Sequence, residues 1–267
     1  MNIENAEYLK RQVYYLGFGE NLKEDLEKNL KAGKDKFELP FTAEFNKGEK
    51  KQVVEYNLNF SKSNQNDMYF LNNYKATLKD ENPEKDKSQT FYVNKSNSVT
   101  AKEAYNLLDG RAVHKKLENR EGEPYEAWLQ LENKKQDNGN HAVKQYHSAW
   151  GYDLDKNVSK IPTKELDSPE QKERLMKSLE KGNLQQVTLN LAGKEEKAFL
   201  EANPKDRNII LYDANMIKQN QGVREHKGES QGQQQGEKAE SKSESSKKEQ
   251  KTEPDGGKKS KGRKMSV

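Results

Sequence analysis

The chain has 267 residues, of which 34% are charged and only 30% hydrophobic, and its formal net charge is +4. This apolar content is well below that of an ordinary globular domain, so we expect part of the chain not to fold. Because the sequence contains no cysteine, disulfide frameworks, thiolate metal sites and cysteine nucleophiles are excluded.

The N-terminal sequence carries no targeting signal that we recognise. MNIENAEYLKRQ has charged residues where a signal peptide requires an apolar segment. No apolar run approaches the ~20 residues that span a bilayer. We therefore expect a cytoplasmic protein that does not enter membranes.

A short helix followed by a glycine is predicted three times along the chain. The expected helix starts are Asn21-x-x-Glu24, Thr100-x-x-Glu103 and Ser168-x-x-Gln171, the last with Pro169 at the first helical position. Each start precedes a pair of apolar residues spaced i, i+4, which is typical of an amphipathic helix. The glycines expected to end these helices in a left-handed conformation are Gly33, Gly110 and Gly182.

Each of these glycines is followed by sequence typical of a β-hairpin. The hairpin turns are expected at Gly48, Gly122 and Gly193. Further strands are predicted near residues 68–78, 90–93 and 208–212. The pattern predicts an α+β protein in which short helices are each followed by a β-hairpin, with mostly antiparallel sheet. The three units are either an internal duplication or a recurrence of a pattern common in α+β chains.

The domain organisation follows from these units and from composition. We predict an N-terminal α+β module over residues 1–99 and a second α+β module over residues 100–217. Residues 218–267 contain 13 basic and 8 acidic residues but only four hydrophobic ones, which predicts a disordered basic tail. The remaining 217 residues carry 35 basic and 36 acidic residues, so the folded body is nearly neutral.

The C-terminal module resembles a known domain family. Five strings carry the resemblance in order: AKEAYNLLDGRAVHKKL, EPYEAWLQLE, KQYHSAWGYDL, SPEQKERLMKSLEKGN and EANPKDRNIILYDANM. They are similar to an uncharacterised domain family of Bacteroides-type gut bacteria, encoded on conjugative or other mobile elements, with related domains appended to topoisomerases. The family has no established catalytic residues, so the resemblance implies only a context of mobile DNA.

No local motif points to catalysis, a metal or a cofactor. Phosphate-binding glycine loops and zinc-protease motifs are missing from the sequence. Asp153-x-Asp155-x-Asn157 opens like a calcium loop, but Val158 and Lys164 occupy the positions that require glycine and glutamate. His141 and His147 lie roughly 20 Å apart along an extended strand, too far to share one ion. We expect a non-enzymatic protein without catalytic residues, metal or cofactor.

Two regions of the second module are secondary candidates for nucleic-acid binding. Tyr146 and Trp150, with lysines nearby, are either a stacking platform for single strands or residues of the core. Arg111, Lys115 and Lys116 form a basic cluster that glutamates dilute, which favours a solvated charged face over a phosphate site.

The end of the tail is the main candidate. Five cations lie within seven residues, namely Lys258, Lys259, Lys261, Arg263 and Lys264. Such an arm can bind a nucleic-acid backbone without reading its sequence, or it can serve only as a solubilising tail. Two functions follow: an accessory protein of a mobile element that associates with DNA or RNA through this arm, or a protein–protein adaptor or inhibitor that binds through its folded body and does not bind nucleic acid.

Overall fold

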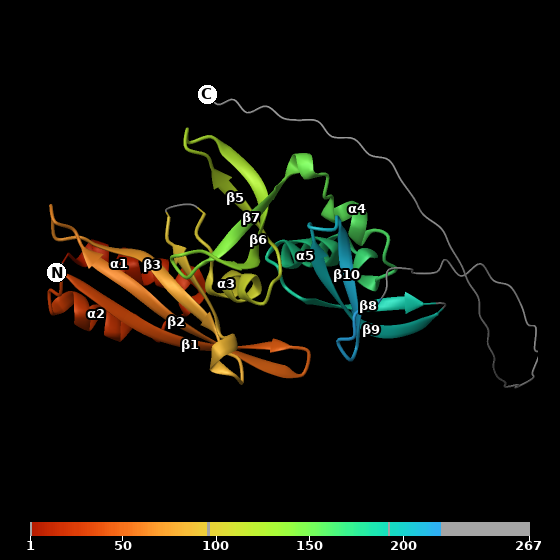
Figure 1. Ribbon diagram of the computed structural model, residues 1–267, viewed down its shortest axis with the longest axis horizontal. Helices are drawn as coiled ribbons and strands as arrows, with labels where there is room; N and C mark the ends of the chain where they lie inside the picture. Colours follow the sequence, from red (N-terminus) through yellow and green to blue (C-terminus); the bar gives the residue numbers. More distant parts are fainter. Residues whose placement is uncertain (1, 95–96, 192, 220–267) are drawn as a thin grey trace, which may run out of the picture. The chain divides into compact units, whose positions relative to one another are not determined.

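The computed structural model describes residues 2–94, 97–191 and 193–219, which belong to one compact unit (Figure 1). Its helices are α1 (Ile3–Val13), α2 (Lys23–Lys31), α3 (Ala101–Leu108), α4 (Leu154–Val158) and α5 (Pro169–Glu180). Its strands are β1 (Lys36–Lys47), β2 (Lys50–Lys62), β3 (Tyr69–Leu78), β4 (Lys87–Tyr92), β5 (Val113–Glu118), β6 (Pro124–Lys135), β7 (His141–His147), β8 (Gln185–Leu191), β9 (Lys194–Asn203) and β10 (Asn208–Asp213). The strands form three sheets, in the orders β1-β2-β3-β4, β5-β6-β7 and β10-β9-β8.

The predicted α+β class is confirmed, because the described strands pair antiparallel throughout all three sheets. Each sheet opens with the predicted hairpin, preceded by α2, α3 or α5. The glycines after these helices have φ values of +68° at Gly33, +89° at Gly110 and +74° at Gly182. The hairpin glycines Gly48, Gly122 and Gly193 also have positive φ, as tight turns require.

Only one of the three predicted helix caps forms as expected. Thr100 and Glu103 make the full reciprocal capping box at the start of α3. The prediction for Asn21 is wrong: α2 begins at Lys23, with Leu22 as its N-cap and no capping side chain. Leu22 is 5% exposed, so burial of this residue fixes the helix start. Ser168 is the N-cap of α5 but makes no side-chain cap bond.

The N-terminal helix α1 was not predicted from the sequence. Its buried face consists of Ala6, Leu9 and Val13, joined by Asn5. The Asn5 side chain accepts from Tyr69 N at 2.7 Å and donates to Tyr69 O at 3.0 Å. This pair of bonds fixes α1 to the start of β3. A π-type turn, Tyr14–Phe18, continues the helix.

The buried side chains form two cores. The first contains α1, α2 and the four-stranded sheet, and it also takes in Tyr105, Leu107 and Leu108 of α3. The second contains α4, α5 and the sheet β8–β10, together with Trp128 and Tyr146 of the middle sheet. Helix α3 therefore packs on the sheet that precedes it in sequence, while the boundary between residues 99 and 100 stays a prediction.

The two cores are joined where α3 meets the end of α5. Asn106 is fully buried, and its amide donates to Lys181 O at 2.6 Å and to Asn183 Oδ1 at 3.0 Å. Gly182 packs so tightly here that an ideal Cβ would lie 2.6 Å from Ala112 O. The described chain ends at Gln219, whose N–H donates to Leu211 O. Most of the predicted tail, residues 220–267, lies outside the described residues.

Candidate functional site: two aromatic surfaces

Two of the three cations in the predicted basic cluster are held inside the fold. Lys115 Nζ donates to Ser98 O at 3.0 Å and to Glu103 Oε2 at 3.1 Å, and the lysine side chain is 13% exposed. Arg111 is 3% exposed, and its Nη2 lies 3.2 Å from Asp109 Oδ2. Only Lys116 projects outward, 3.5 Å from Glu126. The three residues therefore do not form one cationic face.

Arg111 belongs to a partly buried cluster of charges around the ring of Tyr105. Its guanidinium carbon lies 4.8 Å from the ring centroid, and Lys102 Nζ lies 4.7 Å from the same centroid. Lys47 pairs with Asp109 Oδ1 at 2.8 Å. Burial, with a smaller contribution from the Arg111 charge, lowers the pKa of Lys102 to about 8. Through these contacts the three cations connect β1, α3 and the loop after α3.

Tyr146 and Trp150 lie together, as the sequence suggested, but they differ in exposure. Tyr146 is 4% exposed, whereas Trp150 is 41% exposed. Their ring centroids are 5.5 Å apart, and Trp150 Nε1 donates to Pro204 O at 2.8 Å. Gly151 is left-handed at φ +78°, so the chain turns directly after Trp150. One aromatic residue is thus mainly structural and the other is presented to solvent.

Three cations surround this aromatic pair, and we call the whole set the Trp150 surface: Lys144, Tyr146, Trp150, Lys205 and Arg207. The Arg207 guanidinium carbon lies 5.4 Å from the Trp150 ring centroid, and Lys144 Nζ lies 5.7 Å from that of Tyr146. Lys144, Tyr146 and Lys205 also line a hollow of about 340 Å³. Among the described residues, none of the three cations makes an ion pair with a carboxylate, although Glu132 lines the same hollow.

Arg207 has a backbone conformation that non-glycine residues rarely adopt. Its φ is +55°, in the turn between β9 and β10. For a residue with a Cβ this conformation costs roughly 1–2 kcal/mol, and such residues are concentrated at functional sites. The turn places Arg207 against an indole that is 57 residues away in the sequence.

A second aromatic surface lies on α1 and the π-type turn, and the sequence reading did not predict it. We call it the tyrosine surface: Tyr8, Arg11, Tyr14 and Tyr15. The three tyrosines are 46%, 50% and 75% exposed. Tyr8, Arg11 and Tyr15 are spaced i, i+3, i+7, so they lie along one face. The i, i+3, i+7 spacing of aromatic and cationic residues is the signal by which this surface could have been found.

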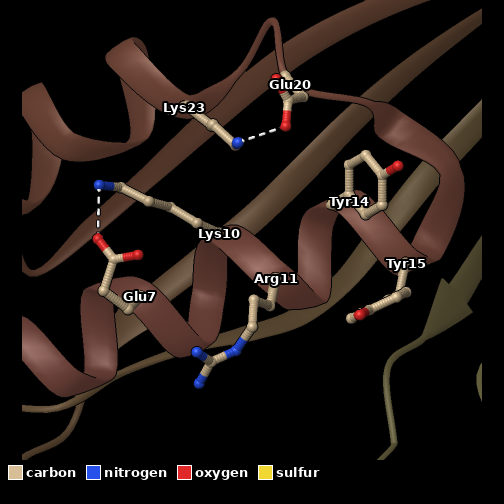
Figure 2. A pocket seen from close by; sticks show the side chains of 7 residues that line it. All are labelled: Glu7, Lys10, Arg11, Tyr14, Tyr15, Glu20 and Lys23. Atoms are coloured by element: carbon tan, nitrogen blue, oxygen red, sulfur yellow. Dashed lines mark hydrogen bonds and ion pairs between the residues drawn. The ribbon is translucent and has the colours of Figure 1, made fainter.

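Two hollows meet at the tyrosine surface and share Arg11 and Tyr15 in their linings. The first, of about 300 Å³, is also lined by Glu7, Lys10, Tyr14, Glu20 and Lys23. Lys10 and Lys23 each pair with a glutamate, at 2.9 Å and 2.6 Å. Arg11 points away from both pairs (Figure 2). The second, of about 350 Å³, is also lined by Tyr8, Gln12, Leu16, Asn94, Ser98 and Thr100.

The other candidates considered from sequence have structural roles or lie outside the described chain. Asp153 caps α4 by accepting from Lys156 N, and His141 Nδ1 hydrogen-bonds with Glu132 O. Within the described ranges, no group of three metal-ligating side chains gathers. The predicted arm lies outside the residues that the structure describes; its members are Lys258, Lys259, Lys261, Arg263 and Lys264.

No family model, curated protein or solved structure matches this chain. Of the helices in the described part of the chain, none has the length and apolar character needed to cross a bilayer. The two aromatic surfaces and the arm are therefore the candidate functional regions of the chain.

Proposed function

We propose that this is a non-enzymatic accessory protein that associates with nucleic acid, using the Trp150 surface to stack an unpaired base and the arm to bind the backbone. The observation that carries the proposal is the exposed Trp150 ring, flanked by Arg207 and by the lysines Lys144 and Lys205. A ring of this kind stacks any base, and unpaired cations nearby neutralise phosphate. We expect single strands to bind more tightly than duplex, because the faces of bases in a duplex are covered by the neighbouring base pairs.

The biological setting is a further part of the proposal. The resemblance of residues 100–217 to domains of conjugative elements supports a role in maintaining or transferring mobile DNA, in the cytoplasm. Single strands form during such transfer, which agrees with a stacking surface. The setting is supported by resemblance alone, whereas the stacking is supported by the contacts at Trp150.

The stacking step is tested with a fluorescent oligothymidylate and the full-length chain. We expect Trp150→Leu to weaken binding about tenfold or more, because a base–aromatic stack contributes about 1–3 kcal/mol. Tyr92→Leu is the matched control, since Tyr92 is an aromatic residue 70% exposed on β4. Anisotropy at low salt measures both affinities, and thermal midpoints show whether each variant is folded. Equal affinities for the two variants would contradict stacking at Trp150.

The arm is tested separately by its salt dependence. Replacing its five cations with glutamine should flatten the log–log salt slope by no more than about 4.5 on duplex DNA and about 3.5 on single strands, since each neutralised phosphate releases counterions. Binding should remain sensitive to Trp150→Leu in this variant. An unchanged slope would remove the arm from the proposal, and no binding to any nucleic acid at low salt would remove nucleic acid altogether.

The second candidate function is protein–protein adaptation through the folded body. The tyrosine surface favours it, because tyrosine and arginine are enriched where protein interfaces have their largest energies. Four of the ten exposed large hydrophobic side chains in the described residues, Ile3 among them, lie within residues 3–15. A concentration of exposed apolar side chains of this kind is typical of a protein-binding surface.

A further inference from the structure

Arg11 is the central group of the tyrosine surface. It lies on the exposed side of α1 between Tyr8 and Tyr15, and both hollows include it in their linings. Over the ranges that the structure covers, no carboxylate pairs with its guanidinium, although Lys10 on the same helix pairs with both Glu7 and Glu27. A guanidinium left unpaired among aromatic rings is suited to a carboxylate from another molecule.

The two hollows differ in the charged groups that line them, although each has one cation in excess. The hollow of about 350 Å³ is lined by Arg11, tyrosine rings, Leu16 and neutral polar groups, and none of its described lining residues is a carboxylate. In that hollow the Gln12 side chain forms no hydrogen bond to any described residue, so its amide is free to bond a peptide backbone. The hollow of about 300 Å³ contains Glu7 and Glu20, each already paired with a lysine (Figure 2).

We propose that the tyrosine surface is the docking site for a protein segment that carries one aspartate or glutamate next to apolar side chains. The carboxylate binds Arg11, and the apolar side chains pack on Tyr8 and Tyr15. The rings of Tyr14 and Tyr15 meet edge to face at 5.6 Å; Tyr15 lines both hollows and Tyr14 lines the first. This inference does not depend on nucleic-acid binding at the Trp150 surface.

The charge distribution favours a peptide over nucleic acid at this surface. Lys10 and Lys23 in the first hollow are already paired with glutamates, so among its described lining residues Arg11 is the one cation left for an incoming anion. A segment with a single carboxylate matches this single free cation, whereas a polyanion is better matched by the three cations of the Trp150 surface. A second copy of the chain docked by two-fold symmetry would bring the same patch against itself, with Arg11 near its own counterpart.

The test begins with a display library of random peptides, selected on the full-length protein. Sequences that also bind the Tyr15→Ser variant are removed by counter-selection. Because Tyr15 is 75% exposed, this substitution should disturb the fold little. We expect the retained peptides to share an acidic residue beside apolar ones. Affinities of a synthetic peptide of that consensus should fall about tenfold with Arg11→Gln or Tyr15→Ser, and should be unchanged with Tyr92→Ser.

A double-mutant cycle identifies the carboxylate–guanidinium contact. Changing the acidic residue of the peptide to its amide should weaken binding by the same factor as Arg11→Gln. Combining the two changes should weaken binding no more than either change alone. Additive losses, or a consensus without an acidic residue, would overturn the proposal. So would an absence of retained peptides, displacement of the peptide by oligothymidylate, or self-association that Tyr15→Ser abolishes.

Discussion

Replacing Gly182 with alanine should lower the free energy of unfolding by about 2–5 kcal/mol, whereas Gly33→Ala should lower it by only about 1–2 kcal/mol. Both glycines follow a helix with positive φ, +74° and +68°, which costs an L-residue about 1–2 kcal/mol. The space around Gly33 is open, but a Cβ on Gly182 would lie 2.6 Å from Ala112 O and 2.9 Å from Val113 Cγ2. Overpacking of this kind adds about 1–3 kcal/mol.

Urea denaturation of the two variants measures the difference directly. The pair is matched, since each substitution adds one methyl group after a helix and only the surroundings differ. A similar loss for both variants would mean that the chain relaxes around Gly182. Because Gly182 lies beside Asn106, whose amide reaches Lys181 O, we expect the Gly182→Ala loss to come from loosening the contact between the two cores.

The repeated helix–glycine–hairpin pattern was predictable because its signals are local. Gly33, Gly110 and Gly182 each stand where a helix ends, and the required positive φ depends on a single residue. Helix starts were less predictable. At α2 the burial of Leu22 decided the start rather than the side chain of Asn21, and burial is settled by the whole fold.

Helix α1 was missed for a related reason. Charged residues and exposed tyrosines surround its narrow apolar face, so composition indicated only a polar segment. Its attachment to β3 depends on the reciprocal bonds between Asn5 and Tyr69, which are 64 residues apart. Asparagine is common in turns, so a sequence that does not reveal the partner of a buried asparagine predicts a loop at that position. The tyrosine surface was therefore missed with the helix that carries it.

Only part of the Trp150 surface could be predicted from the sequence. Lys144, Tyr146 and Trp150 are close in sequence, and the spacing of Lys144 and Tyr146 on one strand places them on the same face. Lys205 and Arg207 come from the distant β9–β10 turn, so only the fold brings them to the indole. The same limit explains Lys115: its partner Glu103 is twelve residues away, on the preceding helix, and nothing local shows that the lysine is buried.

Replacing Lys115 with methionine should destabilise the protein by about 3 kcal/mol, because it leaves Glu103 buried without its counter-charge. The two side chains are 13% and 8% exposed, and Lys115 Nζ also donates to Ser98 O. Lys116→Met is the control: this neighbouring lysine side chain is 87% exposed, and its pairing with Glu126 at the surface contributes at most about 1 kcal/mol. Thermal and urea unfolding measure both variants.

A companion variant separates lost charge pairing from lost packing. Glu103→Gln keeps an oxygen that can accept from Thr100 N, as Glu103 Oε2 does at 2.8 Å, but it removes the negative charge. Combined with Lys115→Met, it should recover most of the lost stability, since replacing a whole buried ion pair by neutral groups is often nearly neutral. If Lys115→Met instead left stability unchanged and weakened oligothymidylate binding, Lys115 would be a phosphate contact and the nucleic-acid site would extend onto β5.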